Sequence, residues 1–352
     1  MVTYLAKRIR YSLLVLLGVI TVVFFLFNVL PADPVRLTMG QRTDFKTTQN
    51  IQHDLGLDKP LWTRYALFLD DLLPIAVHER GNEAMQKYSY IQLLPVSGKN
   101  AITLQWPYLG RSYRTRREVT SVLGEALPGT MLLALAAMVF ATIAGITLGI
   151  VAALNKGKIA DTIALTASVA GISMPSFFAG LLIAYIFGYL LHSVTGLNMT
   201  GSLWDYDAFT GRHLAVGNMI LPALALGIRP LAIITQLTRS ALLDVLQQDY
   251  IRTAYAKGLP RYKVVLRHAL PNALNPVITA VTGWLAELLA GAFFVEYIFG
   301  WKGIGKITVD ALDKFDFPLV MGAVLLTAFI FIVINLLTDM LYTLLDPRVR
   351  LT

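Results

Sequence analysis

The sequence contains no cysteine and has few charged side chains. Asp, Glu, Lys and Arg make up 15% of its 352 residues, whereas 56% are hydrophobic. Without cysteine, disulfides and thiolate metal sites are excluded. Too few charged residues are present to cover a soluble globule of this length, and the mean hydropathy is +0.61. The composition therefore predicts a protein that lies in a lipid bilayer.

The apolar residues gather in six long runs. The hydrocarbon core of a bilayer is about 30 Å thick, and a helix needs roughly 20 apolar residues to cross it. Each run reaches that length and is rich in Leu, Ile, Ala and Phe, whereas a barrel strand would alternate over short segments. We therefore predict an all-α membrane protein with six transmembrane helices, at about residues 9–30, 127–154, 162–191, 214–238, 273–295 and 319–345.

The first run is preceded by basic residues, as the apolar part of a signal peptide would be. Lys7, Arg8 and Arg10 supply the positive charge, but the run is too long and no small-residue cleavage site follows at residues 30–33. We therefore assign residues 1–30 to an uncleaved N-terminal transmembrane helix.

Basic residues are distributed unequally between the short loops on the two sides of the membrane. Short cytoplasmic loops are enriched in Lys and Arg. One side holds thirteen such residues and the other four, so we place both termini, the loop 239–272 and the tail 346–352 in the cytoplasm. The formal charge of +8 is then mostly a topology signal and gives no support for nucleic-acid binding. The thirteen are Lys7, Arg8, Arg10, Lys156, Lys158, Arg239, Arg252, Lys257, Arg261, Lys263, Arg267, Arg348 and Arg350.

Residues 31–118 form a long extracytoplasmic segment between helices 1 and 2 on this topology. Its arginines at 111–117 do not oppose the placement, because long segments translocate largely regardless of charge. Apolar residues at 61, 65, 68, 69 and 72 predict an amphipathic helix over 60–73, and Ile102–Trp106 alternates as a strand does. We expect a folded segment that is too small to be an independent enzyme.

The loop 239–272 carries a helical pattern interrupted by Gly and Pro. Apolar side chains recur every fourth residue from Leu242 to Ala254, which predicts a helix that continues out of the fourth span. Gly258 can end this helix at positive φ, and Pro260 can begin a second one that leads into the fifth span. On this chemistry alone two roles stay open, which are docking into a groove of a soluble partner and lying on anionic lipid.

Several residues of this loop fall in register with a known pattern. The cytoplasmic loop of bacterial ABC importer membrane subunits has Glu-Ala-Ala, three residues, Gly, nine residues, Ile, one residue and Leu-Pro. The present loop resembles it, and the form with Arg-Thr-Ala and Ala-Lys-Gly is similar to that of the dipeptide and oligopeptide permease branch. The residues in register are Ala254, Gly258, Leu270 and Pro271. The residues that differ from the pattern are Arg252, Thr253 and His268.

Further elements in the expected order extend the resemblance over nearly the whole chain. One difference is the stretch from about Pro74 to Pro107, which is longer than in the family pattern and bears on how the outer face meets its partner. The matching elements are Leu55–Leu61, Leu109–Tyr113, Ser173–Phe177, Leu237–Ser240 and Leu345–Arg348.

The resemblance implies the fold of ABC type I importers, with a permease domain over residues 119–345. It implies a pore-forming, non-catalytic subunit of the bacterial inner membrane that imports di- and oligopeptides by alternating access. The implied partners are a second, homologous permease in a heterodimer, two cytoplasmic ATPases that bind Mg-ATP, and an extracytoplasmic solute-binding protein; the chain itself would hold no cofactor. Nickel or a short oligosaccharide is the alternative cargo. The residues implied to couple the chain to the ATPases are Arg252, Thr253, Ala254, Lys257, Gly258, His268, Leu270 and Pro271.

Residues 300–306 match the spacing of a phosphate-binding loop, with Gly300, Gly305 and Lys306 in place. Such a loop needs a Ser or Thr directly after the Lys to bind magnesium, and a strand before it. Ile307 occupies that position, and the preceding residues are apolar like a membrane helix. We therefore predict no nucleotide binding here, and the segment resembles the family's turn between the last two spans.

Arg229 and Glu287 are the charged residues that lie deepest in the predicted spans. Each costs at least about 2.5 kcal/mol at the bilayer centre, so they should face the protein interior, water or each other. They are our candidates for the cargo path, where a zwitterionic peptide would meet complementary charge. A pair that locks the fourth span to the fifth, or a side chain that reaches the surface, is the alternative. In other spans, Asn335 and Asp339 predict interhelical hydrogen bonds, and Pro175 predicts a kink.

A self-contained secondary carrier is the alternative from a different class. Carriers driven by ions are expected to contain internal repeats with matching broken helices, and the sequence shows no convincing repeat. A membrane enzyme would need a convergent catalytic set, which is absent, and the five histidines have no metal-ligand spacing. The sequence therefore favours an importer subunit with neither a catalytic residue nor a metal site.

Overall fold

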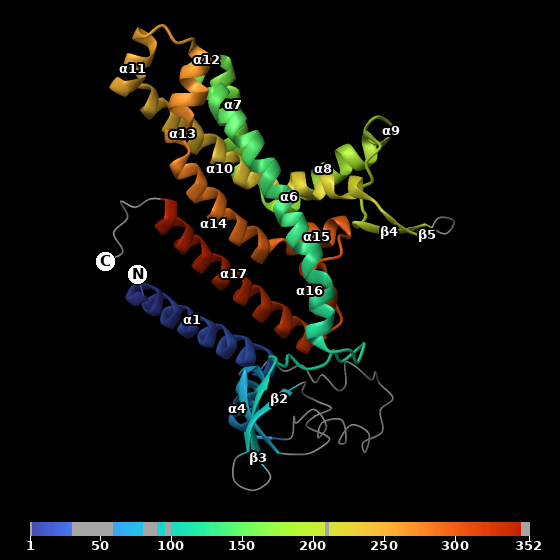
Figure 1. The fold of residues 1–352 in the computed structure, drawn as a ribbon. Coiled ribbons are helices and arrows are strands. Elements are labelled where there is room, and N and C mark those ends of the chain that lie inside the picture. The colour runs from blue at the N-terminus through green and yellow to red at the C-terminus, as the bar shows by residue number, and fades with distance from the viewer. Residues whose placement is uncertain (1, 30–58, 80–89, 96–99, 208–210, 346–352) are drawn as a thin grey trace. The chain divides into compact units, whose positions relative to one another are not determined.

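The computed structural model describes residues 2–29, 59–79, 90–95, 100–207 and 211–345. The described chain is mostly helical (Figure 1). It divides into two compact units. The larger unit comprises Met1–Ser12, Ala126–Val309 and Thr327–Thr352, and the smaller comprises Leu13–Glu125 and Asp310–Leu326. Two small antiparallel sheets accompany the helices, so the prediction of an all-α chain is too simple for the segments between the spans.

Four of the predicted spans are long, apolar helices. By length and composition each can cross a membrane, which confirms helices near residues 9–30, 127–154, 214–238 and 319–345. The four are α1 (Val2–Val29), α6 (Val119–Leu154), α10 (Ile220–Leu246) and α17 (Phe317–Leu345).

The two remaining predicted spans are broken. α7 (Ile159–Ser173) and the helical residues that follow it are bent by 112°, and α14 (Asn275–Gly291) and α15 (Phe293–Phe299) by 61°. The first break confirms the kink predicted at Pro175, because a residue before proline is driven out of the helical region and Met174 is extended. The described chain thus has four membrane-crossing helices, or up to six if each bent pair is one span.

Shorter elements form the second half of the first broken span and connect this span to α10. A strand and a 3₁₀ turn occupy the first residues of the predicted fourth span, so α10 begins later, at Ile220. In chain order these elements are α8 (Ser176–Ile183), the π-helix η1 (Ala184–Leu190), α9 (His192–Thr195), β4 (Trp204–Asp207), β5 (Gly211–Leu214) and η2 (Val216–Met219).

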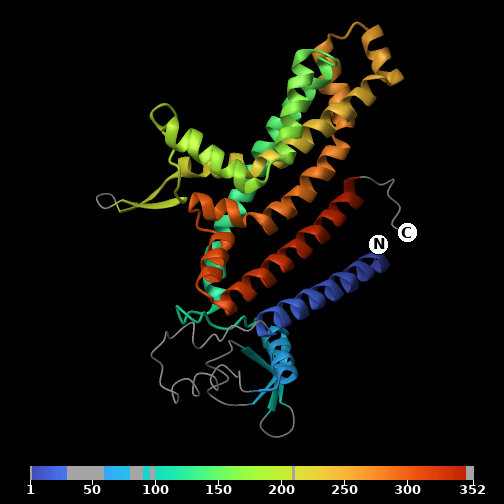
Figure 2. The ribbon, with the colours of Figure 1, turned by 180° about the vertical axis from the view of Figure 1, so that it is seen from behind.

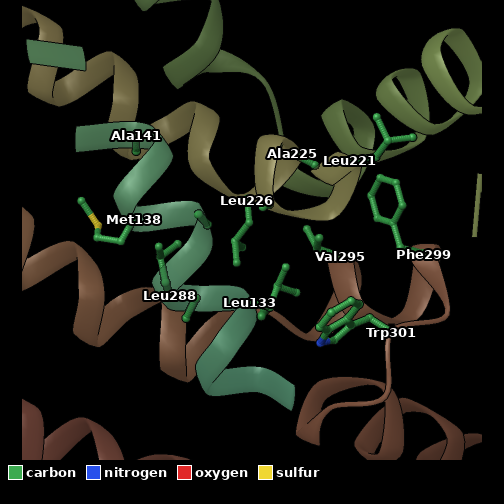
Figure 3. Packing of buried hydrophobic residues seen from close by; sticks show 14 of the residues in the cluster. Leu133, Met138, Ala141, Leu221, Ala225, Leu226, Leu288, Val295, Phe299 and Trp301 are labelled. Carbon is green, nitrogen blue, oxygen red and sulfur yellow. The ribbon is translucent and has the colours of Figure 1, made fainter. Parts of the chain in front are cut away.

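The core of the larger unit lies where α6, α10, α14 and α15 meet (Figure 3). Leu133 of α6, Leu226 of α10, Leu288 of α14 and Trp301 after α15 are all buried there. The indole Nε1 of Trp301 donates to the carbonyl oxygen of Gly129 at 2.9 Å, so the polar atom of this buried ring is satisfied.

α6 approaches α10 closely along a line of small residues. A Cβ atom built on Gly145 would lie 2.8 Å from Cγ2 of Ile234, and one built on Gly149 would lie 2.8 Å from the carbonyl oxygen of Thr235. Small residues at such contacts let membrane helices pack backbone to backbone, where no hydrophobic effect drives association. The two helices therefore form a tightly packed pair.

The smaller unit contains the elements predicted for the outer segment. α4 (Leu61–Leu72) is the amphipathic helix, and its Tyr65 ring lies 5.2 Å from that of Phe24 in α1. The predicted strand is β3 (Asn100–Gln105), which pairs antiparallel with both β1 (Ile75–Glu79) and β2 (Tyr90–Pro95). Other parts of the predicted segment 31–118, including Leu55–Leu57 of the family pattern, lie outside the described residues.

A buried carboxylate closes the turn between α15 and α16 (Ile304–Asp313). Glu296 is fully buried, and its Oε2 accepts hydrogen bonds from the backbone N–H groups of Gly305 at 2.7 Å and Lys306 at 3.2 Å. These N–H groups lack partners within their own helix, and a negative charge at a helix N-terminus is favourable. The hydroxyl of Thr130 in α6 accepts from Ile304 N at 2.8 Å, so the turn is also fixed to α6.

Gly303→Ala should destabilise the protein by about 1–3 kcal/mol, because the new methyl group would overlap the Glu296 carboxylate. Adding Glu296→Ala removes that overlap, so the double variant should lose less stability than the two single variants summed. The thermal midpoint of unfolding in mild detergent is the measurement. Gly305→Ala is the control, since its methyl group would also overlap the backbone of Phe293, which Glu296→Ala cannot relieve. If the stability losses of Gly303→Ala and Glu296→Ala simply summed in the double variant, the contact between the two residues would be contradicted.

Candidate functional site

The chain leaves α10 through a turn. α10 ends at Leu246, Gln248 is extended with φ −73° and ψ 149°, and α11 (Asp249–Ala256) begins after it. The prediction of one continuous helix out of the fourth span is therefore wrong. The turn buries Ile251 and leaves Tyr250 exposed, whereas a straight helix with the four-residue stripe would have turned Tyr250 inward.

A second bend follows α11 and confirms the predicted roles of its Gly and Pro. Gly258 has φ +79°, a conformation that side chains with a Cβ rarely adopt. Pro260 is extended with ψ 147° and begins α12 (Arg261–Lys263), where its fixed φ suits a helix start. The backbone therefore bends between α11 and α12 at a glycine with positive φ and an extended proline.

The segment that begins with α12 leads into α14 without an extended residue. After α12 the chain forms the π-helix η3 (Val264–Ala269) and α13 (Leu270–Ala273), and α14 begins at Asn275. Single π turns often mark functional sites in helices. We call residues 249–273, from α11 to α13, the corner. Figures 1 and 2 show the corner at one end of the larger unit, beside the adjoining ends of α6, α7 and α10.

One face of the corner is buried against the helix ends. Ile251 and Ala254 of α11 pack with Val264 and Val265 of η3, and this cluster includes Leu242 of α10. Ala153 of α6 completes the contact. Burying a side chain the size of Ile contributes about 1.5–3 kcal/mol, so several such residues hold the corner firmly. The corner is thus part of the folded bundle.

The opposite face is exposed and combines aromatic with basic side chains. Tyr250, Tyr255, Tyr262 and Leu266 are 42–62% exposed. Large apolar side chains in water next to positive charge are typical of protein interaction surfaces, where Tyr and Arg are enriched. The exposed basic residues on this face are Arg252, Lys257, Arg261, Lys263 and Arg267.

The eight predicted coupling residues all lie in the corner, but they divide between its two faces. Ala254 belongs to the buried face, Gly258 makes the bend, and His268 and Leu270 are half-buried. The outward-facing residues are Arg252, Thr253, Lys257 and Pro271. Arg252 pairs with Asp249 at 3.4 Å, and because both side chains are well exposed this pair adds little stability.

Two contacts that the sequence pattern did not identify join the helices at and beside the corner. Arg239 of α10 donates through Nε and Nη2 to the two carboxylate oxygens of Asp161 in α7, at 2.5 and 2.8 Å. Arg261 donates to the carbonyl oxygen of Leu154, the last residue of α6, at 3.2 Å. The sequence did contain one signal for the Arg239–Asp161 contact. Asp161 is the sole acidic residue between Glu125 and Asp205, and it stands at the start of an apolar run, where a charged side chain needs a partner.

Arg229 and Glu287 do not form an ion pair in the described structure. The guanidinium carbon of Arg229 lies 5.9 Å from the centroid of the Trp284 ring in α14, and its Nε is buried without a hydrogen-bond partner. This cation–π contact links α10 to α14, which the predicted pair would also have done. Glu287, one turn further along α14, is exposed on this chain.

The turn that matches the spacing of a phosphate-binding loop is already filled. A helix precedes it instead of a strand, and the Glu296 carboxylate takes the N–H groups of Gly305 and Lys306 that a phosphate would need. A second anion there would meet a buried negative charge. The turn is therefore a structural feature that uses the chemistry of an anion site internally.

The polar residues of the last span behave differently from each other. Asp339 of α17 pairs with Arg8 of α1 at 2.5 Å, which confirms its predicted interhelical contact. Asn335 donates to the carbonyl of Phe331 in its own helix at 2.8 Å, so that hydrogen bond is not interhelical. Across the described part of the chain, no three His, Asp or Glu side chains gather as metal ligands.

Comparison with known proteins gives the family. Residues 145–351 match the binding-protein-dependent transport system inner membrane component, and residues 1–87 match the N-terminal part of such membrane components. A solved structure of the MetNI methionine ABC transporter in inward facing conformations has a TM-score of 0.50 at 15% identity. The match covers 64% of this chain and 97% of that one. At this low identity the likeness is evidence for a shared fold and not for a shared cargo.

Curated relatives match over the full length. The di/tripeptide transport system permease protein DppB of Pseudomonas aeruginosa is 37% identical over 365 residues, with 99% of each chain covered. The dipeptide transport system permease protein DppB of Escherichia coli is 34% identical over 368 residues, and the glutathione transport system permease protein GsiC of Pectobacterium atrosepticum 35% over 350, each with 99% of both chains covered. The chain belongs to the dipeptide and oligopeptide branch of the ABC importer permeases.

Proposed function

We propose that this chain is the pore-forming permease subunit of an ATP-driven importer for di- and oligopeptides. Cargo would pass from an extracytoplasmic binding protein to the cytoplasm as the permease alternates between outward- and inward-facing states. The observation that carries the proposal is the corner, which has one face fixed to the bundle and an aromatic, basic face free for a partner. Peptide cargo is supported by the dipeptide, tripeptide and glutathione permeases among the relatives. Nickel or a short oligosaccharide is the alternative cargo.

The chain would work as a non-catalytic subunit. Its proposed partners are a second, homologous permease in a heterodimer, two cytoplasmic ATPases that carry Mg-ATP, and the extracytoplasmic binding protein. The family description names binding-protein dependence, and the glycine-rich turn of this chain is closed by Glu296. Both observations support the proposal that ATP binds to another subunit. No cofactor is assigned to this chain.

The proposed topology is a six-span protein of the bacterial inner membrane in which each bent helix pair crosses once. Residues 1–30 are the first span, 31–118 the extracytoplasmic segment, 119–345 the permease domain and 346–352 a cytoplasmic tail. The excess of Lys and Arg on the side of the corner supports cytoplasmic termini and a cytoplasmic corner. The corner then lies where soluble ATPases can reach it.

Arg229 and Glu287 are the proposed contacts for cargo in the middle of the membrane. An ionised side chain is unfavourable in hydrocarbon, so the exposed Glu287 requires a water-filled path or another subunit beside it. Arg229 lies on the neighbouring helix against Trp284. A peptide with one positive and one negative terminus could satisfy both.

The corner is tested by reversing charge on its exposed face. Arg252→Glu with Lys257→Glu should weaken binding of the ATPase subunits at least about tenfold, or about 1.4 kcal/mol, and ATP-driven uptake should fall with it. Both side chains are exposed, so the buried face that folds the corner is untouched. Co-purification of the ATPases and peptide uptake into proteoliposomes are the measurements.

The matched control for the corner is Lys302→Glu with Lys314→Glu, which makes the same charge change on exposed residues far from it in the sequence. It should retain the ATPase subunits. Undiminished ATPase binding by the corner variant would refute the coupling role, and peptide uptake by the purified chain without ATP would establish the secondary carrier instead.

The cargo path is tested by Glu287→Gln, which removes the charge and keeps the shape. Uptake of a zwitterionic dipeptide should fall about tenfold, the loss expected when one hydrogen bond to a charged group is removed. Assembly with the other subunits should be unchanged. Glu125→Gln, also exposed, is the control. Normal uptake by an intact Glu287→Gln complex would remove this residue from the path.

A further inference from the structure

An ion pair between a buried carboxylate and a half-buried arginine joins α7 to α10 close to the corner. Asp161 is 5% exposed, and both of its carboxylate oxygens accept from the Arg239 guanidinium, at 2.5 and 2.8 Å. The N–H of Gly157, in the turn between α6 and α7, donates to the same carboxylate at 2.9 Å. One side chain therefore ties the α6–α7 turn and the start of α7 to α10.

The corner holds the other end of the same turn. Arg261 of α12 donates to the Leu154 carbonyl, one of the last four carbonyls of α6, which have no partner within the helix. Arg239 lies three residues before Leu242, which belongs to the buried cluster of the corner. Two arginines that flank α11 in the sequence thus hold the adjoining ends of α6 and α7.

Stability alone is a weak reason for such a pair. Apolar side chains of similar volume are often as stable as a buried ion pair, because burying two charges is costly. A bidentate arginine–carboxylate contact adds something that apolar packing lacks, since its two parallel hydrogen bonds fix the orientation of the groups they join. The Arg239–Asp161 pair is suited to keeping α7 in one orientation on α10.

We propose that Arg239 and Asp161 are positioning residues that make α7 move with α10 when a partner displaces the corner. The movement would then reach the 112° break at Met174 and Pro175, where α7 ends and the chain changes direction. The inference rests on the proposed function, because it requires an ATPase that acts on the corner. Without the pair, ATP hydrolysis would continue, but fewer peptides would be imported for each ATP hydrolysed.

The test is the double variant Asp161→Asn with Arg239→Met in the complete transporter. Removing both charges avoids leaving one buried and unpaired, so the complex should assemble and hydrolyse ATP. The ratio of peptide imported to ATP hydrolysed should fall at least about fivefold, the lower end of measured coupling between sites. A merely structural role would reduce the amount of complex and leave this ratio unchanged.

The matched control is Arg8→Met with Asp339→Asn. This second ion pair joins α1 to α17 at 2.5 Å and includes no residue of the corner or of the helices that contact it. The control should keep the wild-type ratio. A wild-type ratio in the Asp161/Arg239 variant, or an equal loss in the control, would overturn the inference.

Arg239→Lys decides the question if the double variant does not assemble. It keeps the buried charges balanced but cannot form both parallel hydrogen bonds, so the complex should form with a ratio lowered at least about twofold. An unchanged ratio would overturn the inference. Failure of the wild-type complex to import peptide with ATP would instead refute the proposed function, so the two failures are distinguishable.

Discussion

The apolar contact between the corner and the ends of α6 and α10 is the interaction on which the rest of the larger unit depends. Ile251, Ala254, Val264 and Val265 bury their side chains there instead of exposing them in a loop. Ordering each residue of such a segment costs about 1–2 kcal/mol of backbone entropy, which the buried area offsets. The result is a connection between two spans that can transmit displacement, because its shape is fixed by the same packing that fixes the helices.

The other buried contacts of this unit keep its helices in fixed relation to one another. Gly145 and Gly149 bring the backbones of α6 and α10 together, and the Trp301 indole and Thr130 hydroxyl fix the turn before α16 to α6. Polar groups that lie within the protein are largely paired, as a low-dielectric surrounding requires. Arg229 is an exception, with an unpaired Nε against Trp284, and Glu287 is exposed nearby in the sequence.

Local sequence signals predicted the features that depend on local chemistry. Gly258 and Pro260 indicated the bend, and Pro175 the break after α7. The length of the apolar runs predicted the helices α1, α6, α10 and α17, and hydrophobic periodicity predicted α4. The four-residue stripe did not predict that the chain turns at Gln248, because periodicity cannot tell whether Tyr250 or Ile251 will find room against α6. The sequence also did not predict the Arg239–Asp161 pair or the hydrogen bonds of Glu296 in the turn, since each joins groups that only the folded chain brings together. Which faces of the corner are buried and which are free therefore had to come from the structure.

The corner and the adjoining helix ends should move as one body during transport. Because the chain has no cysteine, spin labels can be attached to single introduced cysteines at Tyr255 in the corner and Lys156 in the α6–α7 turn. The distance between these labels should stay the same in the nucleotide-free and ATP-bound complex, while the distance from Tyr255 to a label on the second permease changes. A Tyr255–Lys156 distance that shifts between the two states would contradict the account, because the corner would then move independently of the helices it is packed on.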